Sequence, residues 1–197
     1  MSSVATIKRN IIPPHLEVKG GRPLSGILKV SGAKNSSLAL MAAALLTKEK
    51  LLIQNVPQLT DIEVMSEILR NLGAKLTKTN NSIEINSESI HNVELPYELV
   101  HSLRASFFCV GPLLTRLGEA KIPLPGGCNI GARPVDEHIN GLKALGAEVE
   151  VINDVVKAKV SNKNKRLNGA SITLKYPSVG ATETILMASC LALGKTT

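Results

Sequence analysis

Aromatic side chains are almost absent from this sequence, which has two Phe, two Tyr and no Trp among 197 residues. Proteins that bind single-stranded nucleic acid stack the bases on aromatic rings. The 23 Lys and Arg residues give a net charge of +7, which favours anionic partners, but they are scattered along the chain. The densest basic cluster, residues 163–166, stands among asparagines, and we interpret it as a solvated turn. A nucleic-acid-binding module is therefore disfavoured.

Cysteines and long hydrophobic runs are also scarce. Three widely spaced cysteines, Cys109, Cys128 and Cys190, form neither a disulfide framework nor a CxxC metal site. The most apolar run, residues 38–46, is far shorter than the ~20 residues of a membrane span. The first ten residues lack the apolar centre of a signal peptide. We therefore expect a cytoplasmic protein that does not associate with membranes.

A repeat runs through the chain. The triplet Leu72-Gly73-Ala74 aligns with Leu145-Gly146-Ala147 at a shift of 73 residues. Each copy begins with an acidic residue near a predicted helix start, continues with apolar residues at helical spacing, and ends the helix at the glycine. Two β-rich stretches follow, joined at Asn80-Asn81 and at Asn153-Asp154, which are pairs that suit a tight turn.

An Ala- and Leu-rich helix precedes each of these segments, so the predicted unit is strand, helix, strand, helix, strand, strand. This unit occurs twice in full, and a third copy begins near Ile172 and reaches Thr197. Stacked units of this kind share one core and predict an α/β (or α+β) fold. We expect the sequence to be part of a longer protein, because the third unit is incomplete.

The stretch "LPGGCNIGARP" holds the strongest candidate for chemistry. Glycines 126, 127 and 131 permit close backbone approach and movement around Cys128. Arg133 adds a cation that can lower a thiol pKa and bind phosphate or carboxylate. The alternative interpretation of Cys128 is a small buried hydrophobe in a turn, as we expect for Cys109 and Cys190 in their apolar helices.

Two other segments, "VSGAKNSS" and "YPSVGATET", place a glycine-containing turn before a helix start, a geometry that binds anions. Lys34 could add a charge there or simply be solvated. The histidines show no metal-ligand spacing, and we interpret them as surface or packing residues: His15, His91, His101 and His138.

These motifs together resemble the UDP-N-acetylglucosamine enolpyruvyl transferase family (1-carboxyvinyltransferase, MurA). The residues that carry the resemblance are "KVSGAKNSSL", "LRASFFCVGPLLTRLGEAKIPLPGGCNIGARPVDEHINGLKALGAE" and "PSVGATETI". The resemblance implies an inverted α/β barrel of repeated βαβαββ units with pseudo-three-fold symmetry. It further implies a flexible tail over residues 1–15, strands belonging partly to a second domain over 16–33, and a first transferase domain over 34–197 that is incomplete at its third repeat.

The resemblance also implies a reaction. An enolpyruvyl group passes from phosphoenolpyruvate to the 3′-hydroxyl of UDP-N-acetylglucosamine through a tetrahedral intermediate, phosphate is released, and neither a metal nor another cofactor takes part. In the family this is the first committed step of peptidoglycan synthesis, on which cell-wall biogenesis, cell shape and cell division depend. The partners implied are the two substrates and the remaining C-terminal segment of the same enzyme.

The site residues implied by the resemblance fall into two groups. Catalytic roles are implied for Lys34 and Arg133, which bind phosphoenolpyruvate, and for Cys128, the proton donor that phosphoenolpyruvate and fosfomycin modify. Substrate-binding roles are implied for Asn35, Arg104, Pro134, Val135, Asp136, Glu137, Ser178, Val179 and Gly180. Tyr176 departs from the family pattern, because some members have a lysine there that contacts the nucleotide.

Two alternatives stay open. One is the sister enolpyruvyl transferase that uses shikimate phosphate, which "GGCNIGARPVD" disfavours because that enzyme has no cysteine loop. The other is a non-catalytic half that binds UDP-sugar only.

The family's general-base aspartate and several substrate-binding arginines lie later in the chain than Thr197. We therefore predict that the 197-residue chain alone releases no phosphate from phosphoenolpyruvate and UDP-N-acetylglucosamine. A phosphate-release assay checks this, and turnover by the chain alone would refute it.

Overall fold

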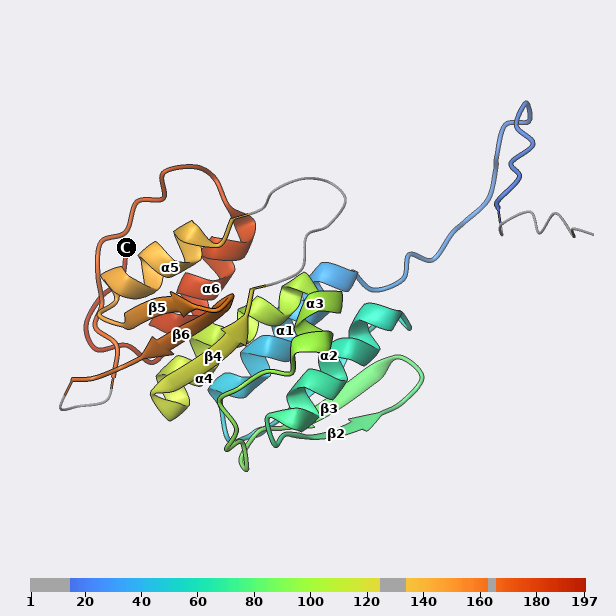
Figure 1. Ribbon diagram of the computed structural model, residues 1–197. Coiled ribbons are helices and arrows are strands. Elements are labelled where there is room, and N and C mark those ends of the chain that lie inside the picture. Colours follow the sequence, from blue (N-terminus) through green and yellow to red (C-terminus); the bar gives the residue numbers. More distant parts are fainter. Residues whose placement is uncertain (1–14, 125–133, 163–165) are drawn as a thin grey trace, which may run out of the picture. The chain divides into compact units, whose positions relative to one another are not determined.

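The computed structural model describes residues 15–124, 134–162 and 166–197 (Figure 1). The chain divides into two compact units, residues 1–30 and 31–197. The described part of the first unit has no helix or strand, and its Leu24 and Ile27 are fully exposed. The described residues 15–33 contain no strand. The assignment of the strands predicted over 16–33 to a second domain stays a prediction.

The second unit contains two copies of one arrangement, followed by a single helix. The first copy consists of α1 (Lys34–Ala43), η1 (Ala44–Leu46), β1 (Lys50–Gln54), α2 (Thr60–Asn71), β2 (Lys75–Lys78) and β3 (Ser82–Asn86). The second consists of α3 (Tyr97–Ser102), η2 (Arg104–Cys109), α4 (Val110–Leu117), β4 (Glu119–Pro123), α5 (Asp136–Ala144), β5 (Glu148–Ile152) and β6 (Val155–Lys159). Helix α6 (Val179–Ser189) follows.

The strand register confirms the 73-residue repeat, but the described residues contain the leading strand of the predicted unit in neither copy. Both sheets are antiparallel, with strand orders β1-β3-β2 and β4-β6-β5. Lys50 and Lys75 flank Asn86 in the first sheet, and Glu119 and Glu148 flank Lys159 in the second. Asn86 and Lys159 are 73 positions apart, which is the shift read from the sequence.

The predicted helix stops are confirmed as well. Gly73 and Gly146 follow α2 and α5 with φ of 101° and 89°, where a side chain would be strained. In α2 the amide of Gly73 donates to the Arg70 carbonyl and that of Ala74 to the Leu69 carbonyl. The α5 end repeats both bonds, so each LGA triplet forms the same left-handed cap.

The two hairpins differ from one another. Asn153 and Asp154 both have positive φ, of 51° and 59°, which is the pairing of a two-residue type I′ turn. The first hairpin instead uses three residues, 79–81, and the Thr79 amide donates to the Ser82 carbonyl at 2.9 Å. The pairs Asn80-Asn81 and Asn153-Asp154 thus predicted both turns, while the loop length decided their type.

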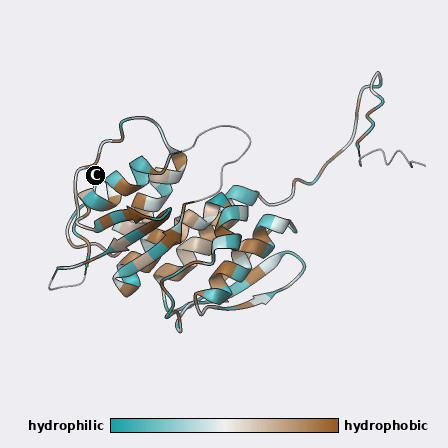
Figure 2. Cartoon of the chain, viewed as in Figure 1, coloured by the Kyte–Doolittle hydropathy of each residue, from teal (hydrophilic) through white to brown (hydrophobic). Residues whose placement is uncertain are grey.

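Helix α6 packs closely against α4 and α5. A Cβ atom on Gly111 of α4 would lie 2.7 Å from the Thr184 carbonyl oxygen, and one on Gly141 of α5 would lie 2.1 Å from the Ile185 side chain. One continuous hydrophobic core includes these helices and the inner faces of the sheets. Figure 2 shows hydrophobic residues along β4 and β6 and on the helices beside them.

Two of the cysteines can be placed. Cys109 is fully buried, as predicted, and burial raises its pKa to about 12. The prediction for Cys190 is wrong: this residue is exposed at the end of α6, where it lines a pocket together with Leu174 and Thr197. Among the described residues no helix has both the length and the apolar character needed to cross a membrane.

Arg116 connects the two copies. Its Nη1 donates to the carbonyl oxygens of Leu45, Thr47 and Ser87, each at 2.9 Å. Partial burial lowers the pKa of this guanidinium, which nonetheless stays charged. One side chain of α4 thus satisfies three carbonyls at the ends of η1 and β3.

We predict that Gly111→Ala destabilises the chain by about 1–3 kcal/mol, because the added methyl group meets the α6 backbone rather than a flexible side chain. Urea unfolding measures the change. Gly20→Ala is the matched control, since its Cβ has no atom within 4 Å. Equal stability of Gly111→Ala and the wild type would contradict the tight packing of α4 on α6.

Candidate active site

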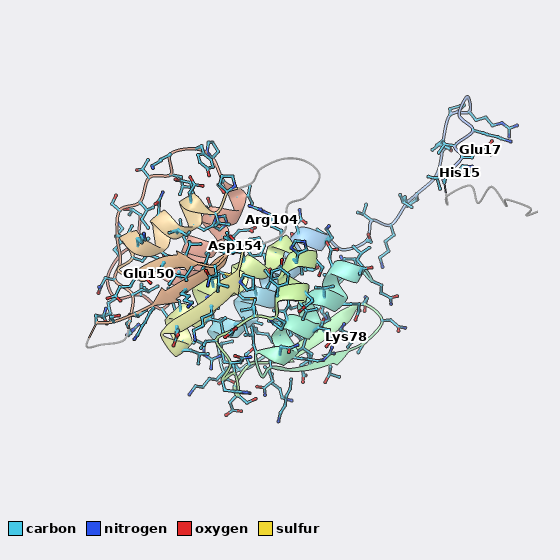
Figure 3. All side chains as sticks on the ribbon, viewed as in Figure 1. His15, Glu17, Lys78, Arg104, Glu150 and Asp154 are labelled. Carbon is cyan, nitrogen blue, oxygen red and sulfur yellow. The ribbon has the colours of Figure 1, made fainter. Side chains whose placement is uncertain are left out.

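A cavity of about 560 Å³ lies where several helices begin. Its lining includes Asn35 of α1, Arg104 at the start of η2, and the first residues of α6. Figure 3 labels Arg104 near the first turn of α6. Of the predicted site residues, the cavity brings together Asn35, Arg104, Pro134, Val135, Ser178, Val179 and Gly180.

The helix starts give the cavity a positive electrostatic character. The first backbone N–H groups of a helix have no partner within the helix and carry the positive end of its dipole. Among the described residues, neither α1 nor α5 has a side-chain cap, while Ser178 Oγ caps α6 by accepting from the Ala181 amide at 3.2 Å. Arg104 adds a guanidinium to the lining, and Glu183 of α6 adds a carboxyl whose pKa burial raises. The part of the cavity at the helix starts and Arg104 is suited to an anionic ligand.

Apolar side chains form the rest of the wall. Leu38, Phe107, Phe108 and Pro177 line the cavity beside the polar groups. A mixed wall of this kind is typical of small-molecule sites, in which flat apolar surfaces take ring faces and a few polar groups fix the orientation.

Lys34 does not line the cavity, although the next residue does. Its Nζ pairs with Asp61 Oδ2 of α2 at 2.6 Å, and both side chains are partly exposed. The α1 and α2 starts therefore hold the lysine beside the cavity rather than in it. An arriving anion would compete with Asp61 for this ammonium group.

Asp136 lies outside the cavity lining as well. Tyr176 does line the cavity, and its hydroxyl donates to Asp136 Oδ1 at 2.5 Å. This hydrogen bond holds the pKa of the Asp136 carboxyl below its usual value and raises the pKa of Tyr176 to about 12. At neutral pH the pair is a carboxylate and a neutral phenol, with the proton on the phenol.

Glu137 is buried, with 2% of its surface exposed, and it too lies outside the lining. Its Oε2 accepts from the Lys175 backbone amide at 2.8 Å, and its Oε1 accepts from Asn140 Nδ2 at 3.2 Å. The Glu137 side chain therefore binds the protein rather than facing the cavity.

His138 is a cavity residue that the sequence analysis did not identify as functional. It is 6% exposed, and its ring packs edge to face with that of Phe107, with 5.0 Å between the ring centroids. Burial, and secondarily the charge of Arg104, lowers its pKa to about 4, so the ring is neutral near pH 7. Its Nδ1 has no hydrogen-bond partner among the described residues. The only signal in the sequence was its place two residues after Asp136.

Cys128 and Arg133 lie outside the described residues, so their predicted roles stay predictions. Among residues 15–124, 134–162 and 166–197, no three His, Cys, Asp or Glu side chains are arranged to hold a metal ion.

The fold has close structural relatives. The chain superposes on the crystal structure of the enolpyruvyl transferase NikO from Streptomyces tendae with a TM-score of 0.74, at 24% identity over 90% of this chain and 41% of that one. It superposes on EPSP synthase from Acinetobacter baumannii with a TM-score of 0.67, at 16% identity over 87% of this chain and 39% of that one. The fold is that of the enolpyruvyl transferases.

The sequence shows the family. Residues 18–197 match the family described as EPSP synthase (3-phosphoshikimate 1-carboxyvinyltransferase), and the chain belongs to that family. A protein of Prochlorococcus marinus (strain NATL2A) named UDP-N-acetylglucosamine 1-carboxyvinyltransferase is 97% identical over the whole chain. A protein of the same name from Prochlorococcus marinus strain MIT 9301 is 61% identical over 93% of the chain. The chain spans 43% and 40% of the length of these two relatives.

We predict that His138→Gln weakens the acid sensitivity of folding. Between pH 6.5 and 4 the unfolded state binds a proton at this histidine and the folded state does not, so the wild type loses up to about 3 kcal/mol over that range. The variant should lose less.

Urea unfolding at several pH values between 4 and 7 measures this difference. His101→Gln is the matched control, because His101 is exposed on α3. If His138→Gln and the wild type lost equal stability on acidification, the neutral buried ring would be refuted.

Proposed function

We propose that this chain forms the part of an enolpyruvyl transferase that holds UDP-N-acetylglucosamine, in an enzyme that transfers the enolpyruvyl group of phosphoenolpyruvate to the sugar 3′-hydroxyl and releases phosphate. The observation that carries the proposal is the cavity, which unites seven of the residues implied by the resemblance from four separate segments. The 97% identical relative bears the name of this activity.

The cavity fits such a ligand in size and in charge. About 560 Å³ lies within the usual range of small-molecule sites, roughly 300–1,000 Å³. A pyrophosphate suits the helix starts and Arg104, and the flat uracil ring suits the apolar wall at Phe107 and Phe108. The neutral His138 adds a polar group without a second fixed charge.

Phosphoenolpyruvate would lie beside this cavity. Lys34, released from Asp61, would bind its phosphate or carboxylate, and Arg133 would bind the same anion. Cys128 would protonate the methylene carbon while the 3′-hydroxyl oxygen bonds to the adjacent carbon and its proton passes to a base. Loss of phosphate and of a methyl proton would then restore the double bond.

The substrate that receives the enolpyruvyl group distinguishes this proposal from its nearest alternative. The family description names the shikimate enzyme, whereas the 97% and 61% identical relatives are named for UDP-N-acetylglucosamine. The step proposed would make this an enzyme of peptidoglycan synthesis.

The test uses a full-length hybrid, in which this chain replaces the matching part of the NATL2A relative. We expect phosphate release with UDP-N-acetylglucosamine and none with shikimate 3-phosphate. Arg104→Ala should raise the KM for the nucleotide sugar about tenfold or more, because it removes a cation from the anion site.

Arg70→Ala is the matched control, since that arginine lies on the exposed face of α2 and pairs with Glu67. Use of shikimate 3-phosphate would favour the sister enzyme. Binding of UDP-N-acetylglucosamine without any phosphate release would favour the non-catalytic half.

Cys128→Ser in the same hybrid tests the proton donor. We expect phosphate release to fall at least about 100-fold, in line with the usual contribution of a general acid. Unchanged release would refute the role of Cys128 without excluding the family, because another acid could supply the proton.

A further inference from the structure

Two acidic residues at the start of α5 hold the segment that leads into α6. Asp136 accepts from the Tyr176 side chain, and Glu137 accepts from the Lys175 backbone amide. Both partners lie just before Ser178, which caps α6. The cavity wall formed by Pro134, Val135 and His138 is thereby tied to the wall formed by residues 176–180.

Glu137 differs from Asp136 in its surroundings. Its carboxylate is almost completely buried, at 2% exposure, whereas Tyr176 on the Asp136 side is 40% exposed. A buried carboxylate is costly unless hydrogen bonds and a favourable field compensate it. Here Lys175 and Asn140 supply the hydrogen bonds, and the α5 N-terminus supplies the field.

The geometry points to Glu137 as a positioning residue for the nucleotide-sugar site. It does not line the cavity, and it acts by fixing the backbone at Lys175, so that the start of α6 faces the start of α5 at a set distance. This inference rests on the proposed function, because the ligand that the site positions is UDP-N-acetylglucosamine.

Two features indicate that the hydrogen bond between Glu137 and the Lys175 amide affects the cavity and not only the local backbone. The bond runs between residues 38 positions apart and joins two segments that both contribute lining residues to one cavity. The Lys175 amide belongs to a segment outside any helix or strand, so its position depends on side-chain contacts of this kind rather than on a ladder of backbone bonds.

The test uses the full-length hybrid with Glu137→Leu, which removes both acceptors, and Glu137→Gln, which keeps an acceptor oxygen for Lys175. For Glu137→Leu we expect the KM for UDP-N-acetylglucosamine to rise about tenfold, because the substitution displaces residues that line the binding site although it replaces none of them. The KM for phosphoenolpyruvate should change less than about twofold, since Lys34 is held separately by Asp61. Glu137→Gln should restore most of the wild-type value.

Hydrogen exchange gives a second readout that does not depend on activity. The Lys175 amide should exchange at least about tenfold faster in Glu137→Leu, while the amides of β5 and β6 should be unchanged. Asn140→Ala is the matched control, because it removes the other partner of Glu137 and leaves the bond to Lys175.

The possible failures are distinct. No phosphate release by the wild-type hybrid overturns the proposed function, and this inference with it. An active wild type whose Glu137→Leu variant keeps its KM for the nucleotide sugar, or loses affinity equally for both substrates, overturns the inference alone. If Glu137→Leu does not fold, Glu137→Asp gives the same test, because it keeps the charge and shortens the side chain by one methylene.

Discussion

Close helix packing is the constraint on which the site depends. Gly111 and Gly141 leave no room for a side chain between α6 and its neighbours, so α6 approaches α4 and α5 closely. This packing brings the first turn of α6 next to the first residues of η2 and α5. A larger residue at either glycine would separate the helices and widen the cavity that they enclose.

The charged groups around the cavity differ in whether they face it or bind other protein groups. The helix starts and Arg104 face the cavity, and so does one acidic residue, Glu183 of α6, whose pKa burial raises. Three acidic residues outside the lining are engaged by other protein groups: Asp61 by Lys34, Asp136 by Tyr176 and Glu137 by the Lys175 amide. These three carboxylates, which orient the walls, therefore do not face an anionic ligand directly. His138, neutral because it is buried, keeps a polar group in the cavity without adding a permanent charge.

Much of the fold could be predicted because its signals are local. The LGA caps, the acidic helix starts and the hairpin at Asn153-Asp154 follow from the preferences of a few neighbouring residues. The exposure of Cys190 was mispredicted because an apolar helix sequence does not reveal which of its faces is covered. The segment 16–33, for which strands were expected, contains none among its described residues. A strand needs a partner strand for its backbone hydrogen bonds, and a local pattern does not reveal that partner.

By itself, the sequence determined the repeat, the order of the helices and hairpins, and the segments that line the cavity, because periodicity and turn chemistry act over a few residues. Only the tertiary structure decided which of those residues share the cavity. It placed Asn35 and Arg104 there with Ser178, turned Glu137 toward Lys175, and added His138. Proximity between residues 35, 104, 138 and 178 arises from helix packing across the repeats, and no local pattern encodes it.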